Sequence, residues 1–336
     1  MREIPPENWM LYGITIVVVA VGTHLLHFVP RTKGKNPLYH GLFLAGVVAL
    51  LLLVPEWVQD ELFSPGGVLL IGTLVPIYET VCAVVSIDAA DDAAWLQFWV
   101  TSGSFSFATE FMDEITAQLP AAGEHWYEFE FFLTLWLALP MTDGAGLIYE
   151  TITKPYIAPV AEKLKQRVEG IMGVILTVVN TSYLWFVWFA FMTLPEEARR
   201  FVVVALGTVY PMSASLVAIS TKPTKKNVEE RFWLTYWASY SVLFILMDYL
   251  ENFVGSIRGF YSVCAVATLY LFLPMFQGAD VVFRRILVPL SGQYENMLLH
   301  DAYLVKVGME DSLPSKEHDR VMAKAAELFV KTKKES

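Results

Sequence analysis

The feature that most constrains this chain is a long internal repeat, in which the same motifs recur in the same order. The string Trp95-Leu-Gln-Phe-Trp99 returns as Trp233-Leu-Thr-Tyr-Trp237. Downstream, a Pro-x-x-x-Gly-Ala element occurs at 140–145 and again at 274–279, and each copy is followed by a further proline. The repeated unit is far longer than the roughly 20–50 residues of a solenoid repeat. We therefore expect a duplicated domain with two like halves.

The composition places both halves in a membrane. Hydrophobic residues make up 55% of the chain and charged residues 17%, whereas a soluble domain carries about 25% charged residues. The mean hydropathy is +0.47. This balance is typical of multi-pass membrane proteins, with the lipid bilayer as the first partner. The net charge of −10, without a long basic run, argues against nucleic acid as a partner.

Apolar segments lie at 9–28, 40–54, 67–86, 95–114, 126–142, 171–194, 201–220, 232–253 and 259–276. Each is expected to be a helix, because lipid cannot hydrogen-bond a free backbone. The sequence thus predicts an all-α, multi-pass membrane protein with two tandem four-segment helical repeats plus an N-terminal transmembrane helix. That helix, at 9–28, is predicted to be an anchor rather than a signal peptide. Segments 40–54 and 126–142 are at or below the usual spanning minimum of about 17 residues, so they are candidates for hairpins within one leaflet.

The basic residues predict an orientation. If the N-terminus lies outside, every Lys and Arg except Arg2, Arg199, Arg200 and Arg258 falls on the inner side. Such a bias is what the positive-inside rule predicts for a chain whose C-terminus is also inside.

The chain is expected to have four parts. They are an N-terminal membrane anchor and basic loop at 1–39, a first membrane repeat with an amphipathic helix at 40–170, a second membrane repeat at 171–294, and a polar tail with an amphipathic helix at 295–336. The first amphipathic stretch covers 156–168. The apolar face of the tail helix comprises Val321, Met322, Ala325, Leu328 and Phe329. Flanking lysines suit a helix at the membrane surface, and a helix packed on a partner protein is the alternative.

The ordered motifs carry a family resemblance over about residues 67–168 and 202–300. The chain resembles the receptor expression-enhancing proteins and their plant and yeast relatives, the deleted-in-polyposis family, in two tandem copies. The structural motif that carries the resemblance comprises Trp95, Trp99, Pro140, Gly144, Pro155, Trp233, Trp237, Pro274, Gly278 and Pro289.

The resemblance implies a function. Members of that family bend the membrane of the endoplasmic reticulum with hairpins that wedge into the cytoplasmic leaflet, with amphipathic helices, and with self-association into scaffolds. Independently of the resemblance, the absence of a converging set of titratable residues predicts no catalysis and no cofactor. Separately, Trp95, Trp99, Trp126, Trp233 and Trp237 are expected at headgroup level, where amphipathic rings are favoured.

Few polar groups suggest chemistry. Glu110 and Asp113 recur as Asp248 and Glu251, at a spacing that puts each pair on one helix face. Acids of this kind form a proton path or a paired charge inside the membrane, or simply lie in water at the outer interface. His24 and His27 share a face, but a single pair is weak evidence for a haem or metal site. We therefore expect no catalytic, cofactor-binding or metal-binding residues.

Two alternatives to autonomous membrane shaping remain. The first is a structural accessory subunit of a large membrane complex, for example of respiratory or ATP synthase type in the mitochondrial inner membrane, with other membrane proteins as partners. The second is a transporter, because tandem repeats also build transporters.

Overall fold

The computed structural model describes residues 55–86, 89–110, 126–139, 142–161, 184–220, 228–255, 259–273 and 276–312, together with a few single residues around 41–49 and at 163 and 257. The described part of the chain is helical, without strands. The predicted anchor at 9–28 and the tail helix beyond residue 312 lie outside the described residues.

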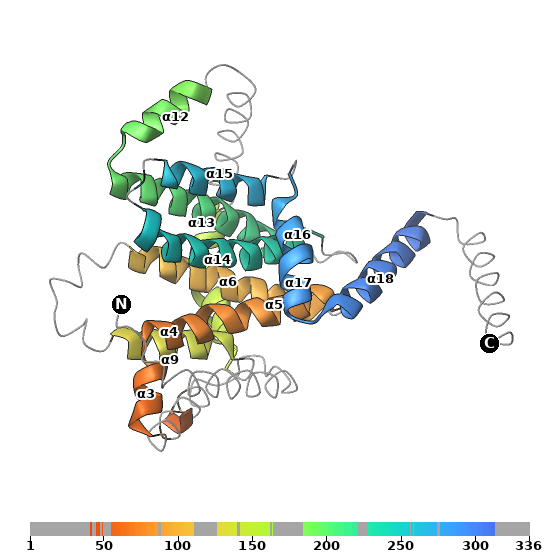
Figure 1. Cartoon of the computed structure of the whole chain (residues 1–336). Helices are drawn as coiled ribbons and strands as arrows, with labels where there is room; N and C mark the ends of the chain where they lie inside the picture. The colour runs from red at the N-terminus through yellow and green to blue at the C-terminus, as the bar shows by residue number, and fades with distance from the viewer. Residues whose placement is uncertain are drawn as a thin grey trace, which may run out of the picture.

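The first copy is a hairpin of long helices followed by short ones (Figure 1). Its elements are α3 (Glu56–Leu62), α4 (Pro65–Leu69), η2 (Leu70–Leu74), α5 (Val75–Val85), α6 (Ala89–Glu110), α9 (Trp126–Ala138), α10 (Gly144–Ile148) and η3 (Tyr149–Ile157). Elements α4, η2 and α5 form one continuous helical run from Pro65 to Val85, which returns through α6.

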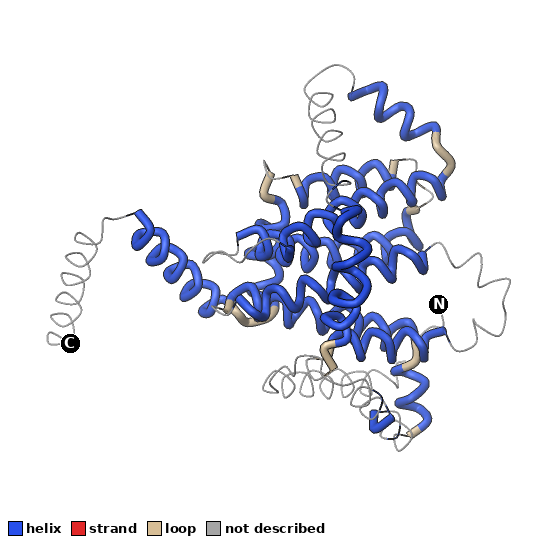
Figure 2. Tube along the Cα trace, turned by 180° about the vertical axis from the view of Figure 1, so that it is seen from behind, coloured by secondary structure: helices blue, strands red, loops and turns tan. Residues whose placement is uncertain are grey.

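The second copy has the same order. Its elements are α12 (Leu184–Thr193), α13 (Glu196–Ser220), α14 (Val228–Val254), α15 (Phe260–Phe272), α16 (Gly278–Val282), η4 (Phe283–Leu287) and α17 (Val288–Leu290), and α18 (Tyr294–Ser312) follows. Figures 1 and 2 show that α12 and α18 project from the helical body. Helix α18 was not expected, because the tail helix was predicted further along the chain, around residues 321–329.

The two copies share one hydrophobic core. A single buried cluster joins Val81, Leu96 and Phe98 of the first copy to Leu234 and Tyr236 of the second. Helix α6 packs against α13 and α14, and α14 also packs against α5. Each half therefore completes the core of the other.

Local sequence explains where helices begin and where they widen. The Ser64 hydroxyl caps α4 by accepting a hydrogen bond from the Gly67 amide at 3.2 Å, and Pro65 occupies the first turn. Pro76 has no N–H to donate to the preceding turn, and that turn, η2, is π-helical. Pro155 lies within the π-helical η3, and Pro289 follows the π-helical η4.

Two helices within the described residues are long and apolar enough to cross a membrane, judged by length and composition: Pro65–Val85 and Glu196–Ser220. They confirm the segments predicted at 67–86 and 201–220. About half of each is buried against the rest of the protein. Helices α9 and α15 have 13 residues each. At 1.5 Å per residue they extend about 20 Å, which is short of a hydrocarbon core of about 30 Å.

Candidate functional site

The repeated tryptophans form the centre of the shared core. The Trp99 indole donates a hydrogen bond to the Thr80 hydroxyl at 2.8 Å, and the Trp237 indole donates to the Ser215 hydroxyl at 2.9 Å. In both copies the acceptor lies on the helix that precedes the tryptophan, so the two side chains are held in the same way.

This placement corrects one expectation. Trp95, Trp99, Trp233 and Trp237 do not lie at headgroup level, because all four side chains are buried in the core. The Trp-Leu-x-(Phe/Tyr)-Trp string combines i, i+3 and i+4 spacing, which puts its large side chains on one helix face. That face points at the other helices, where burial contributes more than an interfacial position does.

The glycines of the motif mark tight turns at the ends of the short helices. A Cβ at Gly144 would lie 2.5 Å from the Trp136 carbonyl oxygen, and one at Gly278 would overlap the Tyr270 carbonyl oxygen. The preceding residues, Asp143 and Gln277, both adopt a left-handed backbone, with φ of 46° and 50°. Each copy therefore reverses direction through the same geometry. Pro140 and Pro274 lie outside the described residues.

A buried ion pair joins the two copies at one end of the core. The Arg231 Nε donates to Asp92 Oδ2 at 2.8 Å, and Arg231 Nη2 donates to the Ser86 carbonyl at 3.0 Å. Asp92 is fully buried and Arg231 is 12% exposed. The guanidinium also contacts Nε2 of His300, on α18.

The electrostatics of this cluster follow from burial. Burial, together with the nearby Asp92 carboxylate, raises the pKa of Glu230 from 4.5 to about 7, against the opposing effect of Arg231. Burial and the Arg231 charge lower the pKa of His300. Glu230 precedes the apolar segment 232–253, and His300 follows it. Both groups therefore lie outside that segment.

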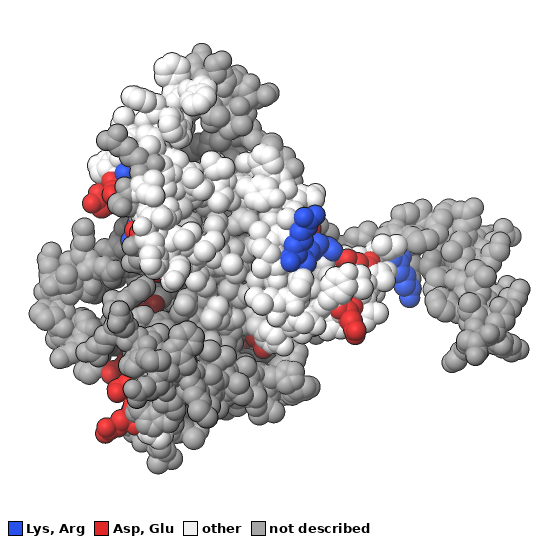
Figure 3. All heavy atoms as spheres, in the orientation of Figure 1, with Lys and Arg blue, Asp and Glu red and all other residues white. Residues whose placement is uncertain are grey.

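Helix α18 is fixed at that same end. Its Met297 is buried, and Arg284 of η4 donates to Asp301 of α18 at 2.7 Å. Large apolar side chains nevertheless remain exposed on η4, α17 and α18, namely Ile286, Leu290, Tyr294, Leu298, Leu299 and Val305. Figure 3 shows a broad face with few charged side chains, with basic and acidic side chains together beside α18 and further acids at the opposite edge.

The acid pair of the second copy lies at that opposite end. Arg200 contacts Glu251 at 3.4 Å and Asp248 at 4.0 Å, and the Tyr261 hydroxyl donates to Glu251 at 2.9 Å. Asp248 is mostly exposed, so this pair is anchored by an arginine near water. Asp113 and the side chain of Glu110 fall outside the described residues.

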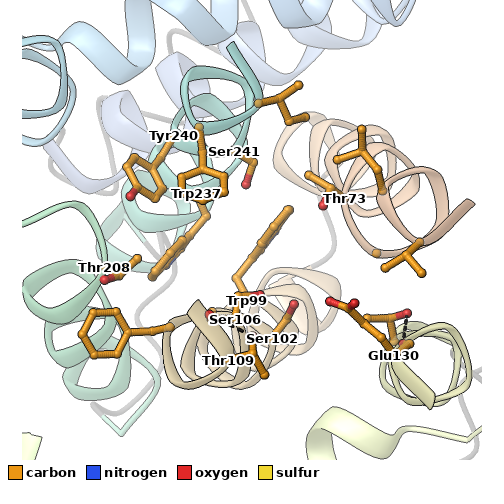
Figure 4. Close-up of a pocket in the computed structure, with 18 of the residues that line it drawn as sticks. Thr73, Trp99, Ser102, Ser106, Thr109, Glu130, Thr208, Trp237, Tyr240 and Ser241 are labelled. Atoms are coloured by element: carbon orange, nitrogen blue, oxygen red, sulfur yellow. Dashed lines mark hydrogen bonds between the residues drawn. The ribbon is translucent and has the colours of Figure 1, made fainter. Parts of the chain in front are cut away.

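One cavity of about 340 Å³ opens between the copies (Figure 4). Its walls come from α4, η2, α6, α9, α13 and α14. The lining residues are Pro65, Val68, Leu69, Gly72, Thr73, Trp99, Ser102, Gly103, Ser106, Phe107, Thr109, Tyr127, Glu130, Thr134, Val204, Thr208, Trp237, Tyr240, Ser241, Phe244 and Ile245. This cavity could not be predicted from the sequence, because its hydroxyl groups come from helices that are far apart in the chain.

Within the described residues no group of three or more His, Cys, Asp or Glu side chains is placed to hold a metal ion. His24 and His27 lie outside those residues, as do Val321, Met322, Ala325, Leu328 and Phe329 of the predicted surface helix. The described helices thus offer a core shared between the copies, an ion-paired end and exposed apolar surfaces.

Comparison with known proteins finds two matching segments, one in each half of the chain. The sequence model of the TB2/DP1, HVA22 family matches residues 76–156 and 211–290. Both matches contain the tryptophan string and the glycine turn. No solved structure gives a significant match.

Several curated proteins are similar to parts of the chain. HVA22-like protein k of Arabidopsis thaliana is 31% identical over 111 residues, which are 33% of this chain and 54% of the relative. Protein yop1 of Schizosaccharomyces pombe is 30% identical over 137 residues, 40% of this chain and 68% of the relative. Receptor expression-enhancing protein 1 of Mus musculus is 31% identical over 103 residues, 31% of this chain and 47% of the relative. The chain spans about half the length of most of these relatives.

Proposed function

Because the chain belongs to the TB2/DP1, HVA22 family, in two tandem copies, we propose that it shapes the membrane of the endoplasmic reticulum. The family is non-catalytic, which confirms the expectation that this protein is not an enzyme. Family members are known as membrane-shaping proteins of that compartment. The comparisons lend no support to a mitochondrial accessory subunit.

The observation that carries the proposal is the exposed apolar strip on η4, α17 and α18. Leu290, Leu298 and Leu299 are exposed beside Arg284 and Arg285. The strip is bordered by charged side chains of both signs, since Arg284 pairs with Asp280 and Asp301. An apolar face with charged borders suits the boundary between headgroups and acyl chains. Inserting such a strip into one leaflet expands that leaflet and bends the bilayer.

The short helices support the same function. Helix α15 extends about 20 Å before the turn at Gly278, which is short of the hydrocarbon thickness, and the described part of α9 before Gly144 has the same length. They add volume to part of the membrane thickness only. The shared core fixes both copies relative to each other, so a single chain presents two such wedges at a set spacing.

The finer architecture belongs to this proposal. We place four segments in each copy, an N-terminal transmembrane helix at 9–28, boundaries at 1–39, 40–170, 171–294 and 295–336, and a surface helix formed by the tail. Self-association on the membrane is the proposed mode of scaffolding. The motif tryptophans, prolines and glycines serve as the structural core of each copy.

Reconstitution into liposomes tests the function. Purified protein is expected to convert round vesicles into tubules as its density rises, as seen by electron microscopy. Replacing Leu298 and Leu299 with Asp is expected to weaken tubulation, and Leu328→Asp with Phe329→Asp should act in the same direction. The matched control, Asn296→Asp with Ala302→Asp, adds equal charge to α18 without removing large apolar side chains.

Two results contradict the proposal. One is round vesicles at every protein density, with the protein instead migrating in a fixed assembly with other membrane proteins. The other is equal tubulation by the leucine variant and its control.

A further inference from the structure

The cavity between the copies has the size and lining of a small-molecule binding pocket. Its volume of about 340 Å³ lies at the lower end of the range of roughly 300–1,000 Å³ for small-molecule pockets. It is lined on one side by Trp99 and Trp237, which lie next to each other in Figure 4. Both indole N–H groups are already bonded to Thr80 and Ser215, so the rings offer only apolar surface to an occupant.

Small residues keep this space open. A Cβ on Gly103 would approach the Trp237 ring at 3.4 Å, and one on Gly72 would approach the Thr134 methyl at 3.2 Å. The helices therefore run close together around the cavity without filling it. An occupant would be slim, comparable to one acyl chain or one fused-ring skeleton, and not a complete two-chain phospholipid.

The polar side chains of the lining indicate which polar group a ligand in this cavity would carry. The hydroxyls of Thr73, Ser102, Ser106 and Ser241 line the cavity, and none of them makes a hydrogen bond in the part of the chain that the structure describes. Hydroxyls both donate and accept. Among the described residues that line the cavity, Glu130 carries a charge and none is Lys or Arg. A head with hydroxyl groups suits this lining, whereas a phosphate would meet a carboxylate and no cation.

The cavity reaches the surface of the described helices. Leu69 and Tyr127 line it and are also exposed, so an occupant meets apolar side chains at the entrance. We infer that this cavity binds an uncharged, hydroxyl-bearing membrane lipid, with its apolar part against Trp99 and Trp237 and its hydroxyl on the serine and threonine side chains.

This inference goes beyond membrane shaping and requires only that the chain lies in a membrane. Photoactivatable lipids test it on the full chain in lipid nanodiscs. One arm uses a monoacylglycerol with a diazirine in its acyl chain, and the other a sterol with a diazirine in its ring system. The two arms decide whether the hydroxyl lipid is a glycerolipid or a sterol. Mass spectrometry is expected to place the label on peptides containing Trp99 and Ser102, or Trp237 and Ser241.

Filling the cavity should strongly reduce the label. Ser102→Leu with Ser106→Leu removes two hydroxyls and occupies the space. Labelling is expected to fall by about tenfold, because both changes weaken binding of the lipid. Ala108→Leu is the matched control, because Ala108 lies on the same helix, is exposed and does not line the cavity. Glu130→Gln is expected to let anionic phospholipid compete better for the site.

The inference is overturned if the double variant and Ala108→Leu label equally, if the label spreads over lipid-facing helices such as α12, or if anionic phospholipid competes with the wild-type protein as well as uncharged lipid does. Thermal unfolding in the same nanodiscs checks that each variant is folded. Liposome tubulation is scored separately, so its failure leaves this binding result intact.

Discussion

At the scale of single residues, Arg231 holds together parts of the chain that are far apart. One guanidinium bonds Asp92 from the first copy, the Ser86 carbonyl at the end of α5, and His300 from α18. A buried pair of this kind adds little net stability as a pair, but removing one partner leaves a buried charge without compensation. The side chain therefore specifies how the copies and α18 dock.

Replacing Arg231 with Met should destabilise the fold strongly. Asp92 would keep its charge in a fully buried position, so the free energy of unfolding is expected to fall by about 3–5 kcal/mol, measured by denaturant titration in mild detergent. Lys154→Met is the control. Its partner is Glu150, the two side chains are 55% and 59% exposed, and breaking this solvent-screened pair should leave the unfolding curve nearly unchanged. Similar small losses in both variants would show that Arg231 is not a docking residue.

Glu230 should make stability depend on pH. Its pKa is about 7 in the folded protein against an ordinary 4.5, so between these values the folded state holds a proton that the unfolded chain has released. Stability is expected to fall as the pH rises from about 4.5 to about 7, and to stay level above that. The neighbouring charges of Asp92, Arg231 and His300 are unchanged in Glu230→Gln.

The comparison of wild type with Glu230→Gln isolates this effect. The thermal midpoint of the variant minus that of the wild type should increase between pH 5 and pH 7. Above pH 7 this difference should stay constant. Parallel curves at every pH would mean that Glu230 keeps an ordinary pKa. His300, whose pKa is lowered, acts in the opposite direction at lower pH and is common to both proteins.

At the scale of elements, the glycine turns decide whether the short helices can fold back. A methyl group at Gly278 would overlap the Tyr270 carbonyl oxygen, which is backbone and cannot move aside. Gly278→Ala is therefore expected to lower the free energy of unfolding by about 1–3 kcal/mol, and Gly144→Ala by a similar amount. Gly103→Ala meets only an ordinary contact of 3.4 Å with Trp237, so its unfolding curve should match the wild type. Equal curves for all three alanine variants would contradict the close approach.

The elements also show how far sequence reasoning reaches. Apolar length predicted the helices at 67–86, 201–220 and 232–253, because a membrane leaves the backbone no other regular structure. The order of motifs predicted the duplication. Helix α18 was missed, since its exposed apolar side chains and charges alternate without a clear period. The tryptophans were misplaced at the surface, because composition does not tell a lipid face from a face buried by another helix.

The cluster around Arg231 illustrates a second limit. Asp92, Arg231 and His300 come from three distant parts of the chain, and nothing in their local sequence links them. Their meeting follows from the packing of α6, α14 and α18, which only the tertiary structure supplies. The cavity lined by Ser102 and Ser241 escaped prediction for the same reason.

At the scale of the whole molecule, the shared core makes the two copies interdependent. Its buried side chains come from both halves, and helices α5 and α6 are covered by α13 and α14. Separating the halves would expose this apolar surface to lipid or detergent, together with the charge of Asp92. Neither half is expected to hold its fold alone.

Splitting the chain tests this dependence. Residues 1–170 and 171–336, expressed together, are expected to associate and co-purify in mild detergent, while each half expressed alone should aggregate or be degraded. The Arg231→Met change in the second half should weaken the association. Two halves that are each monodisperse and stable would mean that the copies are independent domains.

The two copies differ at the positions that form the Arg231 cluster. Counting back from Trp95 and Trp233, Asp92 corresponds to Glu230, but Arg231 corresponds to Ala93. Both halves kept an acid at the junction, and only one acquired the cation that neutralises it. A first half meeting another first half in the same way would bury two aspartates without a counter-charge. The halves are thus not interchangeable, and a first half is expected to pair with a second half rather than with another first half.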